Sequence, residues 1–528
     1  MTIPPNTPVL VGVGQLVSHW QPVAVPGRAE DPGGWELANL LNNGAPFPQS
    51  LRSVATGFAL EDSGVGEGLA AIIDRVVVVR TMLDSVPGAP QPFGRCANPP
   101  GTLAADNYIT PREAIYSQVG GDQPQALVNE SAAAIHAGEC RAILLAGAEA
   151  TSAMKVALKA GMQPDWSYSV EGECIDRGLG SSLLSKYEIA NGLGTPTQTY
   201  PAFENALAAR LGHGKPGHRA LMSALWSGFA SVAARYPYAQ FPIERSADFL
   251  STPSAENYPV ADPYLKWDVA QDAVNQGAAV ILTSVGEADR LGIAPDKRVF
   301  LHGHAHAKDR TPSERPDLSS SLATDLVLKQ TLEASGIAAS DLAHMDLYSC
   351  FPVAVLLAAE ALGIDPLVDP AALTLTGGLP FFGGAGNNYS MHAIAAMVDA
   401  CRAAPGSKGL VLANGGFLSK EAAGVYSTEP QLGWQPLSNA AIQAECDAQA
   451  GPRLLSEDAS GTLESYTVTY TKGEPARGYA FLRTADGARV LARTAKGDAA
   501  KLAAITQNGV AGQTLSSKLI DGVNILDL

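Results

Sequence analysis

The sequence predicts an α/β protein with two similar halves, followed by a separate unit of antiparallel β-strands. Along most of the 528 residues, short apolar runs such as "TPVLVGVGQ" and "IDRVVVVRTM" alternate with longer segments of helical periodicity. The order strand, helix, strand, Gly-rich turn, helix, strand occurs twice, which favours a duplicated architecture. From about Leu437 the pattern becomes period-two alternation with turns at Lys472-Gly473 and Asp486-Gly487, which is typical of a small β-barrel.

The first half is expected to cover residues 1–290. Its predicted strands are residues 7–15, 73–82, 142–147 and 277–284, with helices between them that end at Gly64 and Gly138. This alternation implies a mostly parallel sheet with helices on its faces. Residues 151–263 break the pattern because they are richer in aromatic, Pro and Gly residues, so they predict an inserted segment of helices and loops. Such insertions often cover active sites.

The second half is expected to cover residues 291–432. Strands are predicted at 298–307, 344–351 and 409–417, and helices that end at Gly336 and Gly363 lie between them. A further helix is predicted over 388–404. The remaining segment, 437–528, forms the predicted β domain, so the chain has three units of the size that domains usually have.

Composition narrows the class of protein. A net charge of -16 disfavours non-specific binding to nucleic acid or to an anionic membrane. The six Cys residues are scattered without a CxxC pair, which disfavours a disulfide scaffold or a zinc site and fits a reducing cytoplasm. The start has neither the basic region nor the apolar region of a signal peptide, and no apolar run is long enough to span a membrane. A cytoplasmic protein without membrane insertion is expected.

Two motifs have some features of cofactor-binding sites. The stretch "HGHAH" places His302, His304 and His306 on one face of a predicted strand, where three imidazoles could bind a transition metal. No acidic residue or Cys stands beside them at ligand spacing, so a polar strand face is favoured and no metal is expected. "VGVGQ" has only part of the dinucleotide fingerprint, and no GxSxG nucleophile elbow occurs.

Polar and Gly-rich turns follow three of the predicted strands. "DLYSCF" places Tyr348 and Cys350 at a strand end, and "ANGGFLSKEA" follows another strand. "GGLPFFGGAGNNYSMHA" precedes a helix that begins near Asn387 or Asn388, where backbone N–H groups favour an anion or a developing oxyanion. Each turn alone is equally consistent with a capped tight turn. Together they indicate a ligand site at strand ends, as in other α/β folds.

On these landmarks the chain resembles the thiolase superfamily, closest to its sterol carrier protein thiolase-like (thiolase-like protein type 1) branch. The resemblance covers about residues 8–430 and rests on "EDSG", "AIHAGECRAILLAGAEATSA", "EALGI" and "GGLPFFGG". It implies a five-layered αβαβα thiolase fold with a loop domain inserted in the first half. The C-terminal unit resembles the small OB-like domain found on, or partnered with, some thiolase-like proteins. Proteins of this kind are often named acetyl-CoA acetyltransferase, and the resemblance implies a place in lipid metabolism.

The resemblance also shows where this chain departs from the catalytic pattern of the family. Ungapped counting places the family's nucleophilic Cys on Gly121, which Asp122 follows, so no thiol stands there. The His of the Gly-His-Pro motif and the Cys of the terminal Cys-x-Gly motif are absent as well. The branch's His-Asp-Cys-Phe motif keeps its Cys and Phe but has Tyr in place of His. These three motifs fall on Gly383-Gly384-Ala385, Asn414-Gly415-Gly416 and Tyr348-Ser349-Cys350-Phe351.

Two functions are favoured by the sequence, and a third, a structural partner in a complex with another acyl-CoA enzyme, stays open. In the first, an enzyme acts on a CoA thioester without an acyl-enzyme, with Tyr348 and Cys350 as the acid/base pair and Asn387, Asn388 and His392 as oxyanion or positioning groups. Thiolase-like retro-aldolases that work with an OB-like domain use a Tyr in this way. In the second, the protein is an inactive CoA-binding or regulatory protein. Both imply coenzyme A or acyl-CoA as ligand, and family members usually dimerise, so a monomer or a homodimer is expected.

Overall fold

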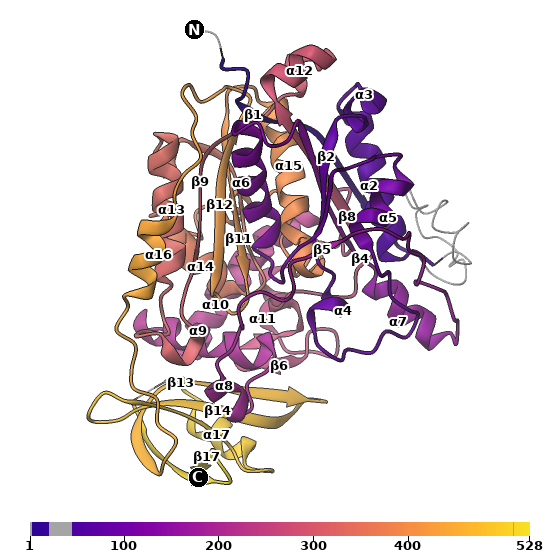
Figure 1. The fold of residues 1–528 in the computed structure, drawn as a ribbon. Helices are drawn as coiled ribbons and strands as arrows, with labels where there is room; N and C mark the ends of the chain where they lie inside the picture. Colours follow the sequence, from indigo (N-terminus) through magenta and orange to yellow (C-terminus); the bar gives the residue numbers. More distant parts are fainter. Residues whose placement is uncertain (1–2, 21–44, 511) are drawn as a thin grey trace.

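The computed structural model describes residues 3–20, 45–510 and 512–528. Two sheets and three helical layers form its main body, and a third sheet lies below them (Figure 1). The first sheet has six strands: β1 (Pro8–Val17), β8 (Gln276–Ser284), β4 (Ala142–Glu149), β2 (Ile73–Val78), β3 (Glu113–Tyr116) and β5 (Ile175–Asp176). The second has four: β10 (Leu342–Leu347), β11 (Lys408–Gly415), β12 (Lys420–Ser427) and β9 (Phe300–Lys308).

Both sheets are mixed, so the expected mostly parallel arrangement is confirmed for part of the first sheet and is wrong for the second. In the first sheet β4, β2, β3 and β5 are parallel neighbours, but β1 and β4 both pair with β8 in the antiparallel sense. In the second sheet only β10 and β11 are parallel. The reason is that β8 returns after a long insertion and β12 follows β11 directly, and neither connection is a helix that crosses over the sheet.

Helices α6 (Gln123–His136) and α15 (Tyr389–Ala403) form the middle layer between the two sheets (Figure 1). Helix α15 is buried on nearly every side, as a helix that contacts apolar surfaces on both sides must be. Helices α2 (Pro48–Asp62) and α5 (Pro99–Asp106) cover the outer face of the first sheet, and α13 (Leu322–Ser335) and α14 (Pro352–Ala361) cover the second. The five layers are those of the expected thiolase fold.

Glycines let the outer helices approach the sheets closely in both halves. A Cβ at Gly14 of β1 would lie 2.1 Å from the carbonyl oxygen of Ala55 in α2, and one at Gly303 of β9 would lie 2.1 Å from that of Thr331 in α13. The glycines of "VGVGQ" and "HGHAH" therefore serve helix–sheet packing. The same device at matching places is a physical sign of the duplicated architecture.

The three His residues of β9 contact the connector that leads to the C-terminal unit. His302 hydrogen-bonds the carbonyl oxygen of Glu429 at 2.7 Å, His304 stacks on Trp434, and His306 hydrogen-bonds Asn439 at 3.1 Å. Among the described residues no group of three His, Cys, Asp or Glu side chains is placed to hold a metal ion. The helix α16 (Ala440–Asp447) that follows this connector packs on β9 and α13.

The inserted segment runs from the first sheet, which its strand β5 joins, to the third sheet, which two of its strands extend. Its elements are α7 (Thr151–Lys159), β5, α8 (Lys186–Ala190), α9 (Pro196–Arg210), α10 (Lys215–Ala233), α11 (Ala247–Ser251), β6 (Pro259–Ala261) and β7 (Tyr264–Leu265). The shorter remaining elements are α3 (Gly66–Ala70), α4 (Met82–Ser85), α12 (Val285–Leu291), η1 (Lys266–Asp268), η2 (Pro295–Lys297), η3 (Pro312–Glu314), η4 (Ala339–Asp341), η5 (Pro370–Leu373) and η6 (Gly386–Asn388).

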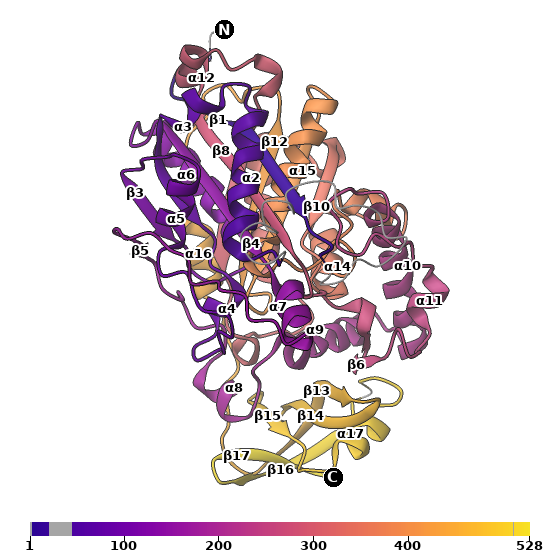
Figure 2. The same cartoon turned by 90° about the vertical axis from the view of Figure 1, so that its right-hand side faces the viewer.

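The C-terminal unit is a closed, barrel-like sheet. Its strands are β13 (Ala459–Thr471), β14 (Glu474–Arg483), β15 (Arg489–Arg493), β16 (Thr514–Ile520) and β17 (Val523–Asp527), with α17 (Ala499–Ile505) beside β14. Pairing of β13 with both β14 and β16 closes the ring. Figure 2 shows this unit at the far end of the molecule from the N-terminus. None of the helices in the described residues has the length and apolarity that a membrane crossing requires.

Candidate functional site

Three segments that are far apart in the sequence meet in front of the N-terminus of α6. Gly121 lies just before α6, Tyr348 follows β10, and Asn414 lies at the end of β11. A Cβ placed on Gly121 would lie 2.3 Å from the Tyr348 hydroxyl oxygen and 2.5 Å from the Asn414 carbonyl oxygen. The hydroxyl of Ser390, at the start of α15, donates to the Gly121 carbonyl oxygen at 3.1 Å. The space that a side chain at position 121 would fill therefore belongs to the phenol of Tyr348.

Tyr348 is buried, and its hydroxyl has no hydrogen-bond partner among the described residues. Its ring packs edge-on against Tyr389, with 5.5 Å between the centroids. Burial raises the pKa of Tyr348 well above its ordinary value, and negative charge on Cys350, Asp122 and Glu421 would raise it further. At neutral pH Tyr348 is thus a neutral phenol that can donate a hydrogen bond.

Cys350 lies two residues further on, and it is buried too. Burial raises the pKa of the Cys350 thiol to about 12, against a smaller lowering by its hydrogen bond with Tyr200. The Asn414 amide nitrogen lies 3.8 Å from the sulfur. Since a thiolate is the reactive form of Cys, this thiol is a weak proton donor rather than a nucleophile.

Tyr200, from α9 of the inserted segment, is a site residue that the sequence did not indicate. Its hydroxyl accepts hydrogen bonds from the Asn414 amide and from the Leu418 N–H, both at 3.1 Å. Its ring stacks on Phe351, with 4.2 Å between the centroids. Nothing near Tyr200 in the sequence marks it, because only folding brings α9 beside the turn after β10.

A buried cluster of charges lies behind Gly121. Asp122 has an oxygen, Oδ1, with no hydrogen-bond partner among the described residues. Burial raises the pKa of Asp122 even though Lys420 opposes the shift, and burial lowers the pKa of Lys420 even though Asp122 opposes it. The Lys420 ammonium donates to the Val119 carbonyl oxygen at 2.9 Å. A Cβ at Gly415 would lie 2.1 Å from Asp122 Oδ1, so Gly415 makes room for this carboxyl.

Glu421 is a second buried carboxyl, and the sequence-based prediction of the site does not include it. It pairs across the strands with Asn414, and its Oε1 has no hydrogen-bond partner among the described residues. Burial raises the pKa of Glu421 well above its ordinary value. The signal was present in "FLSKEA", where two charged residues stand inside an otherwise apolar strand start.

Asn387 and Asn388 belong to η6 and hold other segments in place. Asn387 accepts a hydrogen bond from the Gly120 N–H at 3.2 Å and donates to the Arg80 carbonyl oxygen at 2.8 Å. Asn388 donates to the Gly147 carbonyl oxygen at 2.8 Å, and its own Oδ1 has no partner among the described residues. Asn387 is thus tied to the loop that carries Gly121, whereas Asn388 faces β4.

His392 lies one turn further along α15 and faces the first sheet. Its Nδ1 lies 3.0 Å from the Gln15 side-chain oxygen, and its ring packs against Phe382. Burial lowers the pKa of His392 to about 3, so the ring is neutral. No hydrogen bond or ring contact among the described residues joins His392 to Tyr348.

The glycines of the remaining motifs shape the backbone. A Cβ at Gly383 would lie 2.8 Å from the Gln276 side-chain oxygen, and the Gly384 N–H donates to the Gln271 carbonyl oxygen at 2.7 Å. Gly416 has a φ of +67°, which favours glycine at the turn between β11 and β12. These glycines hold segment 271–276 and that turn against the strand ends.

Comparison with known proteins agrees with this architecture. Residues 441–518 match the family model described as the thiolase-like protein type 1 additional C-terminal domain. No curated protein sequence matches the chain. A solved structure of a monomeric SCP2-thiolase like protein type 1 from Mycobacterium smegmatis is 34% identical, covers 100% of both chains and has a TM-score of 0.82.

Two more distant structures share the fold of the main body. An acetyl-CoA acetyltransferase from Syntrophomonas wolfei is 15% identical, with 80% of this chain and 99% of that chain covered and a TM-score of 0.53. The "Ltp2-ChsH2(DUF35) aldolase" is 18% identical, with 80% and 98% covered and a TM-score of 0.55. Full-length similarity to the first relative and the match of the C-terminal unit lead to one conclusion: this chain belongs to the thiolase superfamily, in the SCP2-thiolase-like protein type 1 family.

Proposed function

We propose that this protein binds an acyl-CoA thioester and stabilises negative charge on the thioester oxygen by hydrogen-bond donation. A carbon–carbon bond is then formed or broken by non-covalent acid/base chemistry. The observation that carries the proposal is the Tyr348 hydroxyl, which lies 2.3 Å from the place of a Cβ at Gly121 and has no partner among the described residues. By resemblance, position 121 is where thiolases carry their nucleophile.

Neutral phenols suit this role. A hydrogen-bond donor in a dry site stabilises an enolate or oxyanion strongly, because no water competes and little reorganisation is needed. Tyr348 is such a donor since its pKa is raised well above its ordinary value. Cys350 is the second neutral donor, and Asn387 positions the Gly120–Gly121 backbone. Asn388 and His392 act at a distance, by holding α15 and η6 against the first sheet.

A base is required to start the reaction, and Asp122 supplies it in this proposal. In the cleavage direction, Asp122 takes the proton of a 3-hydroxyl group, the bond between C2 and C3 breaks, and its electron pair moves to the thioester enolate. The enolate oxygen accepts the Tyr348 hydrogen bond, and C2 is then protonated. Burial raises the pKa of Asp122, which makes its carboxylate a stronger base than an ordinary aspartate. No bond to the protein forms at any step.

A second function is favoured by one observation. Burial raises the pKa values of Tyr348 and Cys350, so both are neutral at pH 7 and neither is poised as a base. That is the condition of a site that keeps a CoA ligand without converting it, as in an inactive CoA-binding or regulatory protein. A role in lipid metabolism and a cytoplasmic location are also proposed, as are domains at 1–290, 291–432 and 437–528.

Exchange of the acyl α-hydrogens of acetyl-CoA in D₂O, followed by NMR, tests the proposal directly. Tyr348→Phe is expected to lower the exchange rate by about 10²–10³-fold, the range for loss of one oxyanion donor. Its control is Tyr108→Phe, a ring that is 94% exposed, which is expected to leave the rate unchanged. Calorimetry with CoA and acetyl-CoA runs in parallel. Binding without exchange would select the inactive alternative, and no binding at millimolar ligand would reject both functions.

A further inference from the structure

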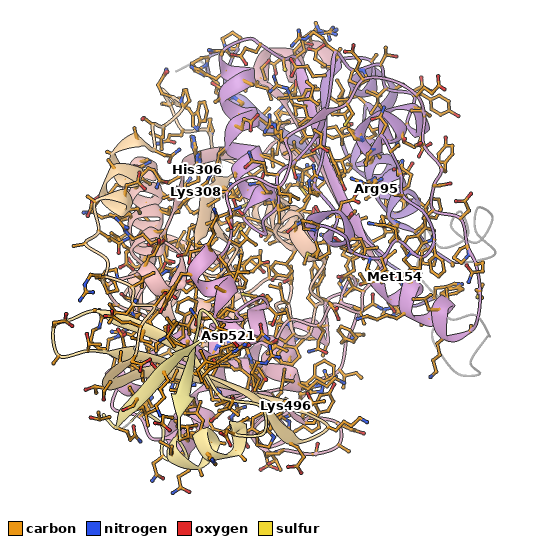
Figure 3. All side chains as sticks on the ribbon, turned by 60° about the horizontal axis from the view of Figure 1, so that its bottom comes forward. Arg95, Met154, His306, Lys308, Lys496 and Asp521 are labelled. Atoms are coloured by element: carbon orange, nitrogen blue, oxygen red, sulfur yellow. The ribbon has the colours of Figure 1, made fainter. Side chains whose placement is uncertain are left out.

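A pocket in the N-terminal half shares no lining residue with the candidate site. It lies between the start of α2, the turn after β2, the loop before α5 and the end of β4. Figure 3 labels one of its residues, Arg95, among the elements of the first half and well apart from Lys496 and Asp521 of the C-terminal unit. The lining residues that carry the argument are Phe47, Arg52, Asp84, Tyr116, Glu149 and Trp166.

Arg52 of α2 is a buried cation in this pocket without a carboxylate partner. Its side chain is only 1% exposed. Its Nε donates to the Gln49 side-chain oxygen at 2.8 Å, but its Nη1 has no hydrogen-bond partner among the described residues. The Gln49 amide nitrogen in turn donates to the Asp106 carboxylate at 2.7 Å, so Arg52 is connected to that carboxylate only through Gln49. A buried guanidinium without an anionic partner costs free energy, and a bound anion would offset that cost.

The indole of Trp166 leaves a second donor unused in the same pocket. Trp166 is 6% exposed, and its Nε1–H has no hydrogen-bond partner among the described residues. Its ring packs edge-on against Phe93, 5.3 Å between the centroids. Buried indole N–H groups usually find an acceptor. Two orphaned donors that line one pocket call for a ligand with acceptor oxygens.

The carboxyl groups that line the pocket do not accept hydrogen bonds from these two donors. Asp84 is paired with Arg95 at 2.8 Å and accepts a hydrogen bond from the Tyr116 hydroxyl at 2.6 Å. Glu149 is 3% exposed and accepts the Met82 N–H at 2.6 Å. Burial raises the pKa of Glu149 to about 8, so at neutral pH it is mainly a neutral acid and does not offset the charge of Arg52. The pocket therefore carries one uncompensated positive charge.

The cavity has a volume of about 40 Å³, so we propose that it binds a very small monocarboxylate such as acetate, whose oxygens accept from Arg52 Nη1 and Trp166 Nε1. Guanidinium groups match carboxylates geometrically, and the aromatic rings of Phe47, Tyr116 and Trp166 form apolar walls for the methyl group. A single charge is specified because Arg95 is already paired with Asp84, and a second negative charge would lie near that carboxylate. The inference does not depend on the proposed function.

Calorimetry and NMR of the whole chain with acetate test the site. Acetate is expected to bind and to shift the Trp166 indole N–H resonance, which Trp166→Phe identifies. Acetamide, which has the same methyl group but no charge, is expected to bind at least about tenfold more weakly. Arg52→Met should weaken acetate binding by a similar factor, while Arg290→Met, a control on α12, should not change it.

Each outcome decides the matter. No heat and no indole shift at millimolar acetate would overturn the site, as would equal binding of acetamide. Inorganic phosphate that competes with acetate would overturn the monocarboxylate assignment. If Arg52→Met fails to fold, the preference for acetate over acetamide and the Trp166 shift still decide the question, because neither needs the Arg52 variant.

Discussion

Gly121 has no side chain, and its neighbours occupy the space that one would need. The backbone around Gly121 is held by Ser390, and the neighbouring volume contains the Tyr348 hydroxyl and the Asn414 carbonyl oxygen. A Cys introduced there is therefore not a simple gain of a nucleophile, since its Cβ would have no space. The phenol of Tyr348 and a side chain at position 121 compete for the same volume.

Gly121→Ala is expected to lower the free energy of unfolding by about 1–3 kcal/mol, the usual cost of forcing extra atoms into a packed interior. The reason is the 2.3 Å approach of its Cβ to the Tyr348 hydroxyl. Chemical denaturation measures the change. The matched control is Gly57→Ala on α2, where a Cβ meets nothing within 4 Å and a helix should gain about 0.5–1 kcal/mol. Equal stability of the two variants would contradict the packing described around Tyr348.

His392 gives the protein a defined sensitivity to acid. Burial lowers the pKa of His392 to about 3 in the folded state, against an ordinary value of 6.5. Between these values the unfolded chain binds a proton that the folded chain does not, so stability falls as pH drops from 6.5 toward 3. Between pH 7.5 and 5 this group removes about 2 kcal/mol. His392→Gln should show a correspondingly smaller loss of stability over that interval in urea unfolding. An unchanged pH dependence would show that His392 is not buried as a neutral ring.

At the scale of elements, the C-terminal sheet is fastened to the main body by a few buried polar contacts. Arg489 of β15 has no exposed surface in its side chain and donates to the Ser313 carbonyl oxygen at 2.8 Å. Its other bonds reach Arg315 and Glu464. Strand β13 also pairs with β6 of the insertion, so the sheet joins two segments that are distant in sequence.

Arg489→Met is expected to destabilise the protein by about 1–3 kcal/mol, because it leaves the Ser313 and Arg315 carbonyl groups without this donor, while Arg483 still pairs with Glu464. Arg453→Met is the control: its ion pair with Asp486 is mostly exposed, at 64% and 62%, and should contribute about 0–1 kcal/mol. Hydrogen exchange of residues 312–316 should rise in Arg489→Met alone. Similar exchange in both variants would contradict a fastening role for Arg489.

For the whole molecule, a monomer is the expected state in solution. Strand β5 of the insertion pairs with β3 and covers the outer edge of the first sheet, the kind of edge through which sheets associate. The net charge of -16 also opposes self-association. Light scattering after size exclusion should give 54.7 kDa, and a mass twice as large would contradict the prediction.

Much of this architecture was predictable from local patterns. The two rounds of strands and helices, the insertion after β4 and the period-two alternation after Leu437 all follow from side-chain periodicity, which short-range geometry imposes. The sequence also pointed to Gly121, Tyr348, Cys350 and Asn414. It could not predict strand direction, because pairing between β8 and its neighbours depends on how a long insertion returns to the sheet.

The sequence by itself determined the class of fold, the absence of a thiol at position 121 and the residue types at the strand ends. Only the tertiary structure decided which of them meet. It placed Tyr348 in the side-chain space of Gly121, brought Tyr200 from α9, and turned His392 toward Gln15. It also decided that Arg52 and Trp166 share a pocket. Burial and proximity set pKa values and leave donors unpaired, and both arise only when segments distant in sequence pack together.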